Sequence, residues 1–274
     1  MTQLSAPLAA LIWMASLSTS PAQDRLPDGG VAESTGPGVV RAWYGQPTDR
    51  YGHGVLGDGI EGGSLVVVED TGRQLELVLP AMQVFEDITP RIADLDGDGR
   101  NEVITIRSGL STGASVVVYE IAGERLVERA STAPLGRPNR WLSIAGIADF
   151  RGDGSRQVAI VKTPHIGGVL EFLALRRDAL VSLYPPKSGY STHFIGSRVL
   201  SLAGVGDLDS DGAAELALPD QSRRRLIVLR FGTSIETVFS SDLPGRVDRA
   251  VRILGGGRIT VPLENGETLT IRVP

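Results

Sequence analysis

The stretch "IADLDGDGRNEVITI" at residues 92–106 places acidic side chains at alternate positions, then a glycine, and then an alternating apolar run. Two further copies occur, "IADFRGDGSRQVAIV" from residue 147 and "VGDLDSDGAAELALP" from residue 205. The copies start 55 and 58 residues apart. A steady spacing of this length is typical of repeat architectures, in which each copy contributes one supersecondary unit.

Each acidic stretch lies among apolar runs of the kind that form strands. A short apolar run precedes the acidic loop, an alternating run follows it, and two more apolar runs come after that. Val, Ile and Leu dominate these runs, and Gly or Pro stands at their ends, which favours strands over helices. Each copy therefore predicts four strands, with the acidic loop joining the first strand to the second.

The segments on either side of the three copies look like incomplete copies. Residues 39–80 supply the second to fourth strands, and residues 249–273 supply the first to third. Because an exposed sheet edge must be covered, pairing between the N-terminal and C-terminal strands would complete both units. We predict an all-β fold, a β-propeller of about five four-stranded blades closed by the N- and C-terminal strands, or of about four if the flanks merge.

The acidic repeats also resemble a known family. "GDLDSDGAAELALPD" is similar to an FG-GAP repeat of the integrin type, and "ADLDGDGRNEVITI" resembles the bacterial VCBS repeat. The resemblance covers residues 39–274 and implies a propeller whose inter-strand loops bind calcium, in a family where many members have no known catalytic activity. The chain is shorter than the seven-bladed integrin head, and its second acidic loop departs from the pattern.

The first and third acidic loops offer the oxygen ligands that calcium prefers. Calcium takes about six to eight oxygens, and acids at loop positions 1, 3, 5 and 9, with a glycine at 6 and a carbonyl at 7, can surround one ion. An Asp-Gly hairpin turn is the alternative, but it needs only positions 5 and 6. The predicted ligands of about two calcium ions are Asp94, Asp96, Asp98, Arg100 and Glu102, and Asp207, Asp209, Asp211, Ala213 and Glu215.

The middle loop has lost part of this ligand set. Arg151 stands at position 3 and Gln157 at position 9, so a cation and an amide replace two carboxylates. Arg151 can take the place of the metal and neutralise Asp149 and Asp153. We predict an internal salt bridge in this loop and a plain turn in "LGGGRI" from residue 254, which has no acidic side chain.

The first 22 residues carry no charged side chain and are typical of a secretory signal peptide. Their apolar stretch, Leu8 to Leu17, is too short to span a bilayer, and small residues precede a cleavage site after Ala22. A buried N-terminal helix is the alternative. Residues 23–38, rich in Pro, Gly and Ser, predict a flexible linker before the propeller at 39–274. We expect an exported protein, periplasmic or secreted, with no membrane span; the sequence has no Cys and hence no disulfide.

Outside the acidic loops, no group of residues matches a known catalytic arrangement. Ser191 stands near His193, but no nucleophile elbow or third triad member accompanies them. His53, His165 and His193 are expected to be solvated loop residues, and Arg223, Arg224 and Arg225 a solvated hairpin tip. Trp43 and Trp141 are expected to pack in the core.

The functional expectation follows from these patterns. The net charge of −5 comes with scattered basic residues, which argues against a nucleic-acid partner. The acids lie within single loops, which suits ligation better than acid–base catalysis. We predict a monomeric, non-catalytic binding or scaffold module with a protein or glycan partner. The alternative is a calcium-dependent hydrolase of a phosphate ester or polysaccharide, and a third possibility is a subunit whose ring needs another chain.

Overall fold

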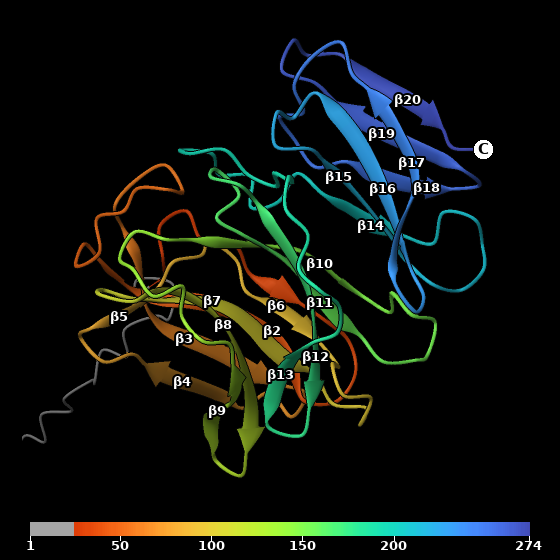
Figure 1. The fold of residues 1–274 in the computed structure, drawn as a ribbon. Coiled ribbons are helices and arrows are strands. Elements are labelled where there is room, and N and C mark those ends of the chain that lie inside the picture. The colour runs from red at the N-terminus through yellow and green to blue at the C-terminus, as the bar shows by residue number, and fades with distance from the viewer. Residues whose placement is uncertain (1–24) are drawn as a thin grey trace, which may run out of the picture.

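A computed structural model describes residues 25–274, and every regular element in that range is a β-strand (Figure 1). The predicted signal peptide lies outside the described residues. Within them, no helix is long and apolar enough to cross a membrane. The all-β prediction is therefore confirmed.

The first nine strands form one antiparallel sheet that contains two units. The order is β1-β2-β3-β5-β7-β8-β9, with β4 paired to β3 and β6 paired to β7. The short strand β5 pairs with both β3 and β7, so it joins the N-terminal unit to the unit of the first acidic loop. The strands are β1 (Ala32–Glu33), β2 (Val39–Thr48), β3 (Glu61–Glu69), β4 (Gln74–Val78), β5 (Gln83–Phe85), β6 (Arg91–Ala93), β7 (Glu102–Gly109), β8 (Gly113–Ala122) and β9 (Arg125–Ser131).

Three separate antiparallel sheets follow along the chain. Two have four strands and the C-terminal one has three, each in sequence order. They comprise β10 (Leu142–Ala148), β11 (Gln157–Lys162), β12 (Val169–Arg176) and β13 (Ala179–Ser182); β14 (Gly204–Gly206), β15 (Glu215–Pro219), β16 (Arg225–Phe231) and β17 (Ile235–Asp242); and β18 (Arg252–Gly255), β19 (Arg258–Pro262) and β20 (Thr268–Arg272).

The predicted internal order of each repeat is confirmed. The acidic loops join β6 to β7, β10 to β11 and β14 to β15, each the first and second strands of a four-stranded unit. These second strands are buried along nearly their whole length, whereas β4 and β20 alternate between exposed and half-buried residues. A strand that is buried on both faces reads as a continuous apolar run, as the sequences after the acidic loops do.

The predicted closure of the ring is not found in residues 25–274. The C-terminal strand β20 pairs with β19 alone, and β1 and β2 pair within the first sheet. Strands β14 to β20 lie apart from the N-terminal strands, shown in red and orange (Figure 1). The edge of the N-terminal unit at β2, where the missing first strand would lie, is paired in part with β1 instead.

The segment expected to be a flexible linker differs from that expectation over residues 25–38. The side chain of Leu26 is 2% exposed, and its N–H donates to the Tyr44 carbonyl oxygen at 3.0 Å. The short strand β1 pairs with β2. Apolar burial and backbone pairing therefore make this segment part of the first sheet.

Neighbouring units pack through glycines on their first strands. Gly146 on β10 faces the side chain of Val205 on β14, and Gly204 on β14 faces the backbone of Val251 ahead of β18. A Cβ atom at either glycine would overlap with these atoms. The two glycines occupy the same repeat position, three residues before the first acid of the loop, so one packing mode recurs between consecutive units.

The predictions for the isolated aromatic and basic residues were partly right. Trp43 and Trp141 are buried, as expected. The histidine prediction was wrong, because His193 is 1% exposed and the other two histidines are half-buried. Arg224 and Arg225 are exposed, but the guanidinium of Arg223 lies over the ring of Phe194 at 4.6 Å. These contacts come from segments distant in the chain.

Candidate metal centres

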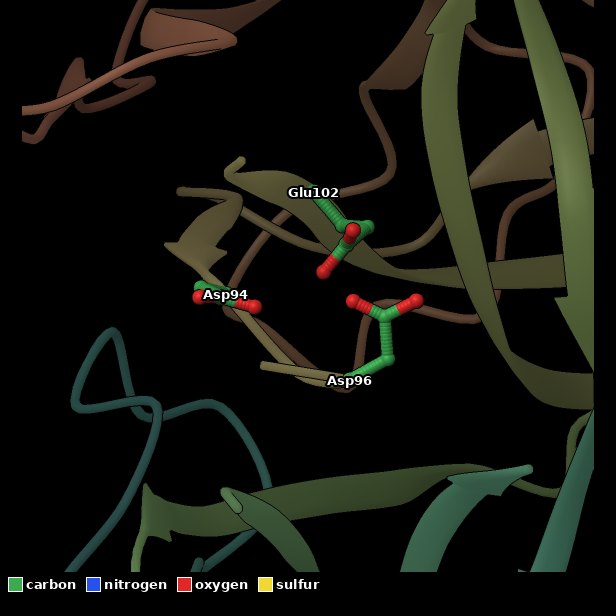
Figure 2. A group of neighbouring side chains, drawn as sticks. All are labelled: Asp94, Asp96 and Glu102. Atoms are coloured by element: carbon green, nitrogen blue, oxygen red, sulfur yellow. The ribbon is translucent and has the colours of Figure 1, made fainter. Parts of the chain in front are cut away.

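The first acidic loop brings three carboxylates together between β6 and β7. Oxygen atoms of Asp94, Asp96 and Glu102 all lie within 4.8 Å of one another, and the side chains point toward a common region (Figure 2). Calcium binds oxygens at about 2.3–2.6 Å, so two ligands on opposite sides of one ion lie at most about 5 Å apart. The spacing of this group therefore fits a single calcium ion.

The third acidic loop repeats this arrangement between β14 and β15. Oxygen atoms of Asp207, Asp209 and Glu215 again lie within 4.8 Å of one another. Loop positions 1, 3 and 9 supply the group in both cases. Two acidic triads that can hold metal ions are thus present, at the loops for which calcium was predicted.

The aspartates at position 5 have another role in the structure. The side-chain oxygen of Asp98 accepts the N–H of Arg100 at 2.7 Å, and that of Asp211 accepts the N–H of Ala213 at 2.8 Å. Neither aspartate belongs to a triad within the described residues. They form the tight turn that brings the chain back into the second strand.

Position 1 organises the backbone of each loop. The carboxylate of Asp94 accepts the N–H groups of Gly97 and Gly99, at 2.7 and 3.0 Å. Asp149 and Asp207 accept the N–H of the corresponding glycine, Gly154 and Gly212. The loop therefore needs an acid at position 1 even where no metal is predicted, which corrects the expectation that the turn alone gives no reason for it.

Position 9 is a buried hydrogen-bond acceptor for the loop. The N–H of Leu95 donates to Glu102 Oε2 at 2.8 Å, and the N–H of Phe150 donates to Gln157 Oε1 at 2.9 Å. The third loop has the same bond from Leu208 to its glutamate, also at 2.8 Å. An amide oxygen accepts this backbone hydrogen bond as well as a carboxylate oxygen does. The hydrogen bond therefore does not explain why two of the loops have a negatively charged residue at position 9, whereas a bound cation would.

An arginine that the loop motif does not reveal lies beside each triad. Arg129 on β9 contacts Asp96 at 2.6 Å and Glu102 at 3.6 Å. Arg230 on β16 contacts Asp209 and, at 3.2 Å, Glu215. The pairing of β15 with β16 could have revealed Arg230. Leu229 pairs with Leu216, so the next residue on β16, Arg230, lies opposite Glu215. Arg129 comes from a different strand of its unit, and no register rule links it to the loop.

Burial and crowding set the electrostatics of the triads. The pKa of Glu102 is raised to about 7: burial and the charges of Asp96 and Asp94 raise it, while the Leu95 amide and Arg129 act in the opposite direction. Burial also raises the pKa of Glu215. Both glutamates are thus placed where their ionised form needs a cation nearby.

The middle loop agrees in part with the predicted internal salt bridge. Arg151 Nε lies 3.4 Å from Asp153 Oδ2. Among the described residues, its guanidinium forms no ion pair with Asp149, whose Oδ1 accepts the backbone N–H of Arg151 instead. The arginine therefore neutralises one aspartate from the loop's exposed side and does not occupy the position of a bound ion.

Replacing the adjacent arginine should tighten calcium binding. Arg230→Gln removes a positive charge that lies against two of the three triad carboxylates, so we expect the calcium Kd of the 207 loop to fall by about fivefold to tenfold, for a coupling of about 1 kcal/mol or more. Isothermal titration calorimetry measures this change.

Arg107→Gln is the matched control, since Arg107 pairs with Glu128 at 2.5 Å, outside either triad. Its calcium affinities should equal those of the parent protein. A weaker affinity in Arg230→Gln would contradict the view that the arginine and calcium compete for the same carboxylates.

Two cavities near the acidic loops, within residues 25–274, each contain residues of at most one triad. A cavity of about 170 Å³ beside the first loop is lined by Glu102 of the first triad, with Asp98 and Arg100 among its other residues, and by no residue of the 207 loop. A larger cavity of about 490 Å³ lies between β6 and β10 and includes Arg91 and Arg156, but no acid of either triad. The acidic groups and the larger cavity are therefore separate features.

Comparisons with known proteins give the chain no family. No family model matches it, and no curated protein matches it. Among solved structures, an exotype rhamnogalacturonan lyase, YesX, is similar at 14% sequence identity with a TM-score of 0.47. The match covers 90% of this chain and 56% of that one, so the chain spans about half the length of the structure it matches. Neither a family nor an activity follows for this chain from a likeness at this level.

Proposed function

We propose that this protein is an exported, non-catalytic binding or scaffold module whose repeated sheets are stabilised by calcium. The observation that carries the proposal is that each acidic triad lies within a single loop. Its members serve that loop through hydrogen bonds to the backbone at positions 1 and 9. Ions bound there would stabilise the connection between the first and second strands of a unit.

The hydrolase alternative has weaker support. Metal-assisted hydrolysis needs the metal, a base and the substrate in one cavity. The cavity of about 490 Å³ contains two arginines but no triad carboxylate. The partner is proposed to be a protein or a glycan, and the chain to act as a monomer.

Calcium titration of the mature protein tests the metal assignment. We expect about two calcium ions per chain, with Kd on the order of 10⁻⁴ to 10⁻³ M, as in extracellular modules. Asp96→Asn should remove one of them, because Asp96 contributes to the first triad. Saturating calcium should raise the melting temperature, since an ion that binds only the folded chain stabilises it by mass action.

Asp149→Asn is the control variant in the middle loop. It should lower stability, because Asp149 accepts backbone N–H groups of its loop, and yet leave the calcium stoichiometry unchanged. Loss of an ion in Asp149→Asn but not in Asp96→Asn would refute the assignment. Calcium-dependent turnover of a phosphate ester or polysaccharide, abolished by Asp96→Asn, would refute the non-catalytic function.

A further inference from the structure

The three histidines of the chain, far apart in sequence, come together in the structure. His53 lies between β2 and β3, His165 between β11 and β12, and His193 between β13 and β14. His53 and His165 line one cavity of about 140 Å³, which we name the histidine cavity; Asn139 and Trp141 line it as well. His193 lies behind His165, with 2.8 Å between His193 Nδ1 and His165 Nε2.

His53 is held by a buried carboxylate. Its Nδ1 contacts Glu86 Oε1, and the side chain of Glu86 is fully buried. The other carboxylate oxygen of Glu86 accepts the hydroxyl of Ser108, and the Glu86 carbonyl accepts the Trp141 indole N–H at 2.9 Å. A carboxylate fixed in this way favours the proton on His53 Nδ1, which leaves a lone pair on Nε2.

The donor and acceptor of each hydrogen bond made by the other two histidines can be assigned. His193 Nε2 lies 2.9 Å from the Ser197 carbonyl oxygen, which can only accept, so the nitrogen donates. His193 is fully buried and contacts no carboxylate among the described residues, so its ring is neutral and Nδ1 accepts. His165 therefore donates from Nε2 and keeps a lone pair on Nδ1.

We propose that the histidine cavity binds a divalent transition metal of the zinc class through His53 Nε2 and His165 Nδ1. Neutral imidazole nitrogens suit zinc, copper and nickel, whereas calcium prefers the oxygens of the acidic loops. Metal-binding histidines usually donate their second ring N–H to a carboxylate or another acceptor, and both histidines do so here. Water or an added ligand completes the coordination. The site is independent of the calcium loops and of the proposed function.

Zinc titration in the presence of excess calcium tests the site, since calcium then occupies the acidic loops. The full mature chain without any added histidine should bind about one zinc ion. His53→Gln and His165→Gln should each weaken the binding by about tenfold or more, and Glu86→Gln, which loosens the positioning of His53, by about tenfold. The double variant Asp96→Asn/Asp209→Asn should bind zinc as the parent does.

A second measurement needs no variant. Electron paramagnetic resonance of the parent protein with one equivalent of Cu²⁺, again in excess calcium, should show coupling to imidazole nitrogens. Absence of nitrogen coupling overturns the proposal, as does the absence of zinc binding by the parent. Zinc affinity that is unchanged in both histidine variants, with their calcium stoichiometry intact as proof of folding, also overturns it.

Discussion

Glu61→Gln should stabilise the protein by about 3 kcal/mol at pH 7, and by more at pH 9. Glu61 is 2% exposed, and within residues 25–274 no hydrogen bond and no cation lowers the pKa of its carboxyl group. Burial, together with the charges of Glu86, Asp58 and Asp87, raises the pKa of Glu61 from 4.5 to about 9. The folded protein therefore holds a proton at pH 7 that the unfolded chain has released.

The direction of the pH dependence follows from this raised pKa. Stability from Glu61 is fully present below pH 4.5 and is lost progressively as the pH rises to about 9. pH 7 lies about 2.5 units above the ordinary pKa of 4.5. At 1.36 kcal/mol per unit, the free energy of unfolding is lower there by about 3 kcal/mol. Glutamine has the same shape as the protonated acid and does not titrate, so the variant avoids the loss.

Urea denaturation of both proteins at pH 5, 7 and 9 measures this difference. The gap between variant and parent should widen with pH. Glu33→Gln is the control, because Glu33 lies on the surface with 72% of its side chain exposed, and should change stability by less than about 0.5 kcal/mol. A gap that is constant with pH, or a less stable Glu61→Gln variant, would contradict the assignment of a buried protonated carboxyl.

Phe172→Ala should lower the free energy of unfolding by about 3–5 kcal/mol, the usual range for truncation of a buried phenylalanine. Phe172 on β12 is fully buried, and its ring lies 4.2 Å from that of Phe231 on β16 and 5.2 Å from that of Phe150. These rings come from two consecutive units. The substitution therefore opens a cavity at the contact between sheets and weakens the coupling of the units.

Denaturant unfolding followed by circular dichroism measures the loss. Phe172→Leu should lose less, and Val181→Ala on β13, where the side chain is 43% exposed, should stay within about 0.5 kcal/mol of the parent. A loss below about 1 kcal/mol in Phe172→Ala would show that the aromatic contact between the units contributes little.

The sequence was sufficient for the features that repeat locally. Alternating apolar runs, the acidic loops and their 55- and 58-residue spacing predicted four-stranded units with the loop between the first two strands, and the structure confirms this. These features depend on residues within one unit. The closure of the ring depends on strands at opposite ends of the chain, and the sequence has no signal for the bridging role of β5.

In the candidate sites, too, the residues that lie close in sequence could be predicted and those brought together by packing could not. The triad members at positions 1, 3 and 9 lie in one loop and could be predicted from their spacing. Arg129 could not be predicted, because it reaches the first triad from β9, beyond the loop and its two strands. That His53 and His165 line one cavity depends on the packing of separate units, so in the sequence each looked like an isolated loop residue.

The shared hydrogen bond at position 9 has a consequence for how such a chain changes over generations. A glutamate codon becomes a glutamine codon through a single base substitution, and Gln157 keeps the backbone contact that Glu102 makes in its own loop. A repeat can therefore lose or regain the negative charge at position 9 in one substitution that keeps the backbone hydrogen bond of the loop. The number of loops that are able to hold a metal ion can therefore differ between repeats that share the same loop backbone.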